Sequence, residues 1–113
     1  MRVPLWKIAH ARSGDKADRA DIGLFAFDPE TYAVLKREVT KERLARHFAA
    51  MTSAPVELWP LDNILALKIV LNGALQGGAA RSIRMDNLGK NVAAQLLRME
   101  IDAPENLPRL KAR

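Results

Sequence analysis

The sequence predicts an α+β fold, a sandwich of ferredoxin-like type in which an antiparallel or mixed sheet carries helices on one face. The 113 residues are enough for one domain with a single core, and a content of 49% hydrophobic and 27% charged residues is that of a globular protein. Apolar residues alternate in some segments and recur every three to four positions in others. The resulting order is β-β-α-α-β-β-α-β, with short turns between most paired strands.

Five segments show the pattern of strands. Alternation or a short apolar run marks residues 3–10, 21–27, 56–61, 64–71 and 99–103. Because the run at 64–71 is nearly continuous, it is expected at the centre of the sheet. The segment 56–61 contains a proline, which is typical of an edge strand.

Capping residues mark the helices. Asp28 stands before a proline and a glutamate, so a helix should begin there and continue to about residue 39. Thr40 is expected to cap a second helix, and the apolar spacing over 87–99 predicts a third. Residues 104–113 read as a frayed basic tail, so that the single domain 1–113 has its core within the first 103 residues.

The composition excludes several kinds of chemistry. The chain has no cysteine, which rules out disulfides, thiolate catalysis and cysteine-based metal sites. Two histidines are too few for a histidine-rich metal site, and carboxylate ligation of magnesium or calcium stays open without a D-x-D-x-D loop to support it, so no metal is the expectation. No segment has the roughly 20 consecutive apolar residues of a membrane span, and the first residues do not resemble a signal peptide, so a cytoplasmic location is expected.

The positive charge is localised. Of the net charge of +5, residues 1–20 carry +3 and residues 81–98 carry +3, whereas 21–80 sum to −1 and 99–113 to zero. This distribution favours a local anion site. Because basic runs and aromatic RNA-binding motifs are missing from the sequence, nucleic acid is not the expected partner.

Two polar motifs coincide with this charge. Arg12-Ser13-Gly14-Asp15-Lys16 interrupts the strand pattern and predicts a loop that can bind an oxyanion. The second motif combines the permissive backbone of a glycine-rich stretch with cations. Its candidate ligand residues are Gly77, Gly78, Arg81, Ser82, Arg84, Asp86 and Lys90. Lys68, the one charge of the central strand, either extends to an edge of the sheet or reaches a buried anion.

Together the two motifs resemble a known family. A-H-A-R-S-G-D-K-x-D followed by I-G, and G-A-L-x-G-G-x-x-R-S-x-R-x-D-x-x-G-K from Gly73 to Lys90, are similar to the ferredoxin-fold domain associated with acyclic terpene utilisation protein A (AtuA). The resemblance implies a small subunit that accompanies a larger AtuA-like protein in the catabolism of branched or terpenoid acids. It also implies a carboxylate or coenzyme A thioester as the candidate substrate, with no further cofactor.

Three function classes follow. In the first, the chain is an accessory subunit in which Arg12 and Lys16 neutralise an anion and Ser13 and Gly14 donate hydrogen bonds. In the second, the chain is a docking module, the arginines being internal salt-bridge partners of Asp15 and Asp86. In the third, it is a stand-alone lyase or hydratase. When isolated, the chain is expected to form a homo-oligomer.

His10 and Asp15 are the candidates for catalysis. His10 is the only plausible general base near the first motif. Its alternation with Trp6 and Ile8 nevertheless favours a core or half-buried histidine over a catalytic one. Whether the chain is an enzyme is left open by the sequence.

Overall fold

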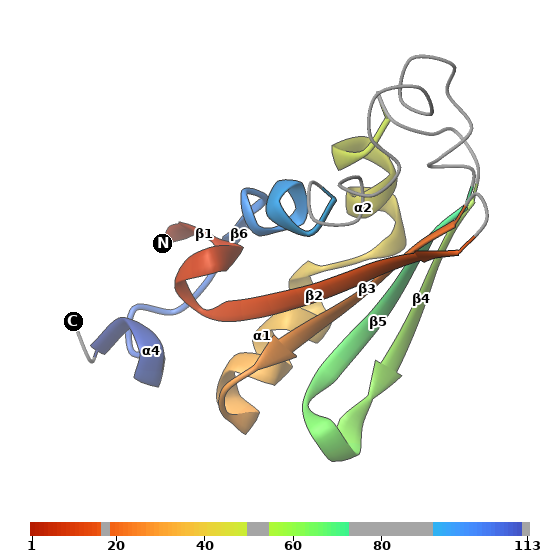
Figure 1. Ribbon diagram of the computed structural model, residues 1–113. Coiled ribbons are helices and arrows are strands. Elements are labelled where there is room, and N and C mark those ends of the chain that lie inside the picture. Colours follow the sequence, from red (N-terminus) through yellow and green to blue (C-terminus); the bar gives the residue numbers. More distant parts are fainter. Residues whose placement is uncertain (17–18, 50–54, 73–91, 112–113) are drawn as a thin grey trace.

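The computed structural model describes residues 1–16, 19–49, 55–72 and 92–111 of the chain. It has two layers, a four-stranded antiparallel sheet and helices packed on one of its faces (Figure 1). The strands are β2 (Ala9–Lys16), β3 (Arg19–Ala26), β4 (Val56–Leu61) and β5 (Ala66–Leu71), and their order in the sheet is β2-β3-β5-β4. The α+β prediction is therefore confirmed, as are the central position of β5 and the edge position of β4.

The helices begin where the caps predict. In α1 (Pro29–Glu38), the Asp28 side chain accepts a hydrogen bond from the Thr31 N–H at 2.7 Å. In α2 (Lys41–His47), the Thr40 hydroxyl accepts from the Arg43 N–H at 3.2 Å. Both side chains satisfy N–H groups that have no partner within the helix. A further helix is described over residues 92–97, within the span predicted for the third helix.

The core lies between this helical layer and the inner face of the sheet. Residues of β3 are alternately buried and half-buried, which places Ala20, Ile22, Leu24 and Ala26 toward the helices. The largest fully buried side chains are Phe48, Leu5, Ile8, Ile22, Leu24, Leu35, Leu44, Leu67, Ile69, Leu71, Leu96 and Ile101. The helices therefore cover one face, and the opposite face, called the open face below, carries the other residue of each alternating pair.

A small second sheet joins the two ends of the described fold. It pairs β1 (Arg2–Pro4) antiparallel with β6 (Glu100–Asp102). Glu38 at the end of α1 braces this region. It accepts hydrogen bonds from Arg43 Nη1 at 2.9 Å, from Arg37 Nε at 3.0 Å and from the Asp102 N–H at 3.3 Å. Burial alone would raise the pKa of Glu38, but the hydrogen bonds from Arg37, Asp102 and Arg43 together lower it.

A tyrosine holds the connection between β4 and β5. The Tyr32 hydroxyl lies 2.6 Å from Asp62 Oδ1 and 3.1 Å from the Ala66 carbonyl oxygen. Burial and the contact with Asp62 raise the pKa of Tyr32 to about 12. Asp62 belongs to the 3₁₀ turn η2 (Asp62–Ile64), so this bond fixes α1 to the end of the hairpin.

Three predictions of local structure were wrong. The first strand is interrupted by a 3₁₀ turn, η1 (Leu5–Lys7), which shifts the alternation, so Ile8 is buried but Trp6 and His10 are exposed. The segment from Arg12 to Lys16 is the end of β2 rather than a loop. The polar residues from Arg12 to Lys16 can belong to a strand because one face of an antiparallel sheet can be exposed to water.

The C-terminal segment also differs from the frayed tail that was expected. It contains a short helix, α4 (Pro108–Lys111), and Leu107 is buried. The guanidinium of Arg109 lies 3.9 Å from the centre of the Phe27 ring, a cation–π contact that attaches this helix to the end of β3.

Candidate functional site

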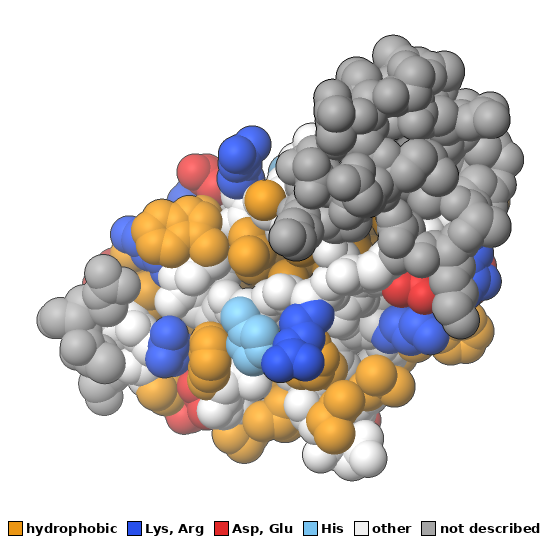
Figure 2. Space-filling view, viewed as in Figure 1, with side chains coloured by type: hydrophobic (Ala, Val, Ile, Leu, Met, Phe, Trp, Pro, Cys, Tyr) orange, Lys and Arg blue, Asp and Glu red, His pale blue; other side chains and the backbone are white. Residues whose placement is uncertain are grey.

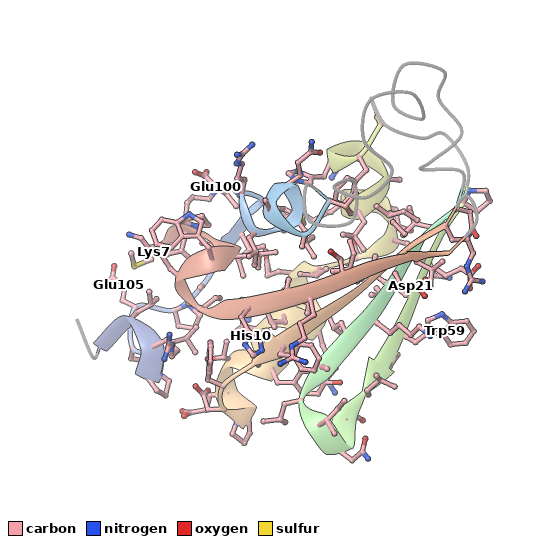
Figure 3. All side chains as sticks on the ribbon, viewed as in Figure 1. Lys7, His10, Asp21, Trp59, Glu100 and Glu105 are labelled. Atoms are coloured by element: carbon pink, nitrogen blue, oxygen red, sulfur yellow. The ribbon has the colours of Figure 1, made fainter. Side chains whose placement is uncertain are left out.

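The open face is organised as rows of residues that the strand register places side by side. Three rows cross the four strands in the order β2, β3, β5, β4. The His10 row contains His10, Phe25, Ala66 and Leu61; the Arg12 row contains Arg12, Gly23, Lys68 and Trp59; and the Gly14 row contains Gly14, Asp21, Val70 and Glu57. Figure 3 labels His10, Asp21 and Trp59, one residue of each row.

A hollow lies in the middle of this face. Its volume is about 300 Å³, and it is lined by Arg12, Ser13, Gly14, Asp21, Ile22, Gly23, Phe25, Leu61, Ala66 and Lys68. Three of the open-face positions among these are glycine or alanine, so the sheet backbone itself forms much of the floor. Larger side chains surround this floor, which is why a flat sheet presents a concave surface here.

Two cations flank the floor. Arg12 on β2 and Lys68 on β5 are the immediate neighbours of Gly23 in the Arg12 row, one on each side. Both side chains are exposed, and neither makes an ion pair with another described residue. Two cations held about 10 Å apart across two strand spacings can bind one anionic group between them.

Aromatic rings form the apolar wall of the hollow. The Phe25 ring folds back over Gly23, and a Cβ added to Gly23 would lie 2.8 Å from Phe25 Cε1. His10 stacks on Phe25 with a centroid separation of 5.0 Å and an interplanar angle of 11°, and it also contacts Phe27 at 5.1 Å. Glycine at position 23 therefore allows the aromatic stack to form.

His10 is at the surface, beside a cationic side chain of the same face (Figures 2 and 3). It is two residues from Arg12 on β2, so both side chains point to the open face. The imidazole thus lies at the margin of the hollow, held by ring contacts. Its role as a general base stays a prediction.

Asp21 supplies the negative charge of the hollow. Its Oδ1 atom is buried and has no hydrogen-bond partner in the described part of the chain, and Arg19 Nη2 lies 3.8 Å away. At that distance the two groups attract each other but do not form a hydrogen bond. The Asp21 side chain as a whole is 32% exposed, so its negative charge borders the hollow although Oδ1 itself is buried.

Three residues of the first motif line this hollow. Arg12, Ser13 and Gly14 line it, whereas Asp15 and Lys16 continue β2 toward the hairpin end. The second motif, including Gly77, Gly78, Arg81, Ser82, Arg84, Asp86 and Lys90, lies outside the described residues. The predicted salt-bridge network of the two loops therefore stays untested, although no described carboxylate pairs with Arg12.

Sequence reasoning missed several residues of the hollow on β3 and β4. Gly23, Phe25 and Leu61 were not singled out, because their neighbours are set by strand register rather than by sequence distance. The alternation visible in the sequence placed Lys68 on the same face of its strand as Ile64, Ala66 and Val70. Lys68 is exposed on the central strand β5, and its contact with an anion stays a prediction.

Other features of the described residues limit the chemistry. No group of three or more His, Asp or Glu side chains in the part that the structure describes could hold a metal ion. No helix among the described residues is long and apolar enough to cross a membrane.

The family comparison covers nearly the whole fold. Residues 3–102 match the model of the AtuA ferredoxin-like domain. The chain belongs to this family. No curated protein and no solved structure matches it significantly. As an AtuA ferredoxin-like domain, the chain includes both sheets and the open face within the matched region.

Proposed function

We propose that the chain is a small accessory subunit that binds an anionic metabolite with an apolar body on its open face and works with a larger AtuA-like protein. The observation that carries the proposal is the pair of cations, Arg12 and Lys68, on either side of Gly23 in a hollow with apolar walls. This AtuA ferredoxin-like domain would thus hold a carboxylate, or the anionic end of a coenzyme A thioester.

The polarity of the rows supports a ligand of this class. An anionic head over the Arg12 row would receive charge-assisted hydrogen bonds from Arg12 and Lys68. A branched hydrocarbon body could then lie over the His10 row, where Phe25, Ala66 and Leu61 offer apolar contact. A nucleic acid would require basic groups spread along the face, whereas here two carboxylates, Asp21 and Glu57, follow in the next row.

The accessory role is supported by what surrounds the hollow. His10 at its margin contacts the rings of Phe25 and Phe27, and the described residues do not pair it with a nucleophile or a second acid. The hollow is also open toward solvent. Described residues that can bind an anion without forming a complete set of reacting groups fit the role of a partner to an enzyme better than that of an enzyme.

Calorimetric titration tests the ligand site. The purified chain is titrated with a 3-methyl-branched medium-chain carboxylate, with its coenzyme A thioester and with the corresponding neutral alcohol. The acid or thioester should bind and the alcohol should not. Arg12→Ala and Lys68→Ala should each weaken binding by about tenfold or more, because each removes a charge-assisted hydrogen bond.

The matched control is Arg98→Ala, which removes an exposed cation outside the sheet. It should leave binding unchanged. Equal affinity for acid and alcohol, or equal losses in all three variants, would contradict a specific anion site.

The accessory role has its own test, a tagged pull-down from the native cell with mass spectrometry of the captured chains. Recovery of one large AtuA-like protein in stoichiometric amount is expected. Turnover of the ligand by the purified chain alone would instead support the stand-alone lyase or hydratase. Assembly that depends on Trp59 but not on Arg12 would favour the docking module, for which the exposed Trp59 is the specific observation.

A further inference from the structure

A second hollow lies where α2 meets the small β1–β6 sheet. Its volume is about 300 Å³. The residues that line it come from β1, from α2 and from the beginning of β6 with the residue before it: Arg2, Arg43, Arg46, His47, Met99 and Glu100. Figure 3 labels Glu100. This hollow is separate from the one on the open face, because the two share no lining residue and α2 belongs to the layer on the other side of the sheet (Figure 1).

Hydrogen bonds hold the walls of this second hollow together. Arg43 Nη1 donates to the Glu38 carbonyl oxygen at 3.1 Å and to Glu38 Oε1 at 2.9 Å, and Arg43 Nη2 donates to the Glu100 carbonyl oxygen at 2.7 Å. His47 Nε2 lies 2.6 Å from the Gln95 carbonyl oxygen. Because a carbonyl oxygen only accepts, Nε2 carries a proton and Nδ1 takes no part in this bond. α2 is therefore tied both to β6 and to the helix over residues 92–97.

The lining carries more positive than negative charge. Three guanidinium groups and one carboxylate give three positive charges less one negative, a sum of +2 with His47 neutral. Glu38 pairs with Arg43 but also with Arg37, so counting Glu38 and Arg37 as well leaves this sum unchanged. Groups of one sign that converge on one hollow repel each other, and an anion between them removes that repulsion. The charge therefore indicates an anionic ligand.

Two of the guanidinium groups are available to a ligand. Arg46 is exposed, and its side chain makes no hydrogen bond or ion pair with another residue in the described ranges. Arg2 Nε lies 3.9 Å from Glu100 Oε1, which is too long for a hydrogen bond. The last turn of a helix favours cations, which accounts for Arg46 on α2. It does not account for Arg2, which reaches the same hollow from β1.

We propose that this hollow binds a phosphate group, either free phosphate or the phosphoryl group of a small metabolite. A phosphate dianion neutralises the sum of +2 in the lining, whereas a carboxylate would neutralise half of it. Guanidinium groups also match phosphate oxygens with paired N–H donors. The inference goes beyond the ligand site proposed for the open face and does not depend on it.

The size and shape of the hollow favour a small ligand. A volume of about 300 Å³ is at the lower end of the range for small-molecule sites. A nucleic acid backbone would need cations spaced along an extended track. Here the three guanidinium groups line one hollow, and the carboxylate of Glu100 lies among them.

An NMR titration of the purified full chain tests the proposal, with inorganic phosphate as the probe. At about pH 8 phosphate is mostly a dianion, and sodium chloride keeps the ionic strength constant, so that general screening does not contribute. The backbone N–H resonances of Arg46, His47 and Glu100 should shift and saturate, with a Kd of about 1 mM or below. Acetate, a monoanion, should bind at least about tenfold more weakly.

Charge-removing variants place the ligand in the hollow. Arg46→Gln and Arg2→Gln should each weaken phosphate binding by about tenfold, because each removes a charge-assisted hydrogen bond. Lys41→Gln is the matched control, since Lys41 is an exposed cation in the first turn of the same helix and does not line the hollow. It should leave the affinity unchanged. The amide spectrum of each variant shows that the fold is kept.

Ribose 5-phosphate distinguishes the two sources of the phosphate group. Tighter binding than that of inorganic phosphate supports a phosphorylated metabolite, and equal or weaker binding supports free phosphate. The proposal is overturned if the phosphate shifts do not saturate, or if acetate binds as tightly as phosphate. It is also overturned if Arg46→Gln binds phosphate as well as Lys41→Gln does.

Discussion

Replacing Thr31 with valine should stabilise this protein even though it deletes a polar group. Thr31 is fully buried in α1, and its Oγ1 has no hydrogen-bond partner within the described ranges. Valine has the same shape, so the substitution removes a desolvated hydroxyl and leaves no cavity. The hydrogen bond from the Thr31 N–H to Asp28 is kept.

The magnitude follows from the cost of an unpaired buried hydroxyl. That cost is about 1–3 kcal/mol, and helix propensities of threonine and valine are nearly equal. We therefore expect the free energy of unfolding to rise by about 1 kcal/mol, which is about 4 °C in Tm for a domain of this size. Urea denaturation followed by circular dichroism measures the change.

Thr40→Val is the matched control, because the same substitution there removes a hydroxyl with a partner. The Thr40 Oγ1 accepts a hydrogen bond from the Arg43 N–H and caps α2, so its loss should cost about 1 kcal/mol. The two variants should therefore shift stability in opposite directions. The reasoning is refuted if Thr31→Val destabilises the protein as much as Thr40→Val does.

Three further predictions concern charge, the hollow and the tyrosine contact. The pKa of Glu38 is lowered from 4.5, so the stability it contributes is present above 4.5 and is lost as the pH falls through the lowered value. Glu38→Gln should thus be less stable than wild type at neutral pH, with a smaller difference at about pH 3, and a pH-independent difference would contradict this. Gly23→Ala should displace the Phe25 ring and weaken carboxylate binding in the calorimetric titration, while backbone stiffening offsets the lost stacking to within about 1 kcal/mol; unchanged binding would place the ligand elsewhere. Tyr32→Phe should cost about 1–2 kcal/mol in urea denaturation, because Asp62 and the Ala66 carbonyl lose a donor, and a neutral result would show that water replaces the hydroxyl.

Local chemistry explains which parts of the fold could be predicted from the sequence. Asp28 and Thr40 satisfy N–H groups within three residues of themselves, so both helix starts were predictable. The apolar run of β5 needs burial on both sides, which fixed its central position. The break at η1 was not predictable in this way, because the spacing of Trp6, Ile8 and His10 is that of a continuous strand, although only Ile8 of the three is buried.

The candidate site depends on register and could be predicted only in part. Arg12 was identified from its motif, but its neighbour Gly23 comes from another strand, and Lys68 from a third. A shift of one residue in either pairing would send those side chains to the helical layer. The sequence contains each strand's alternation, whereas the alignment between strands comes from the packing of the inner face.

The pairing of β1 with β6 has a consequence for the order in which the chain folds. Its partners, such as Arg2 and Asp102, are about 100 residues apart in sequence. The β2–β3 and β4–β5 hairpins close over a few residues and can form while the chain is being synthesised. In contrast, β1 is the first strand of this domain to leave the ribosome, and it must remain unpaired until β6 has emerged. The β1–β6 sheet should therefore form last. During refolding, the backbone N–H of Val3 should become protected from hydrogen exchange later than those of the two hairpins.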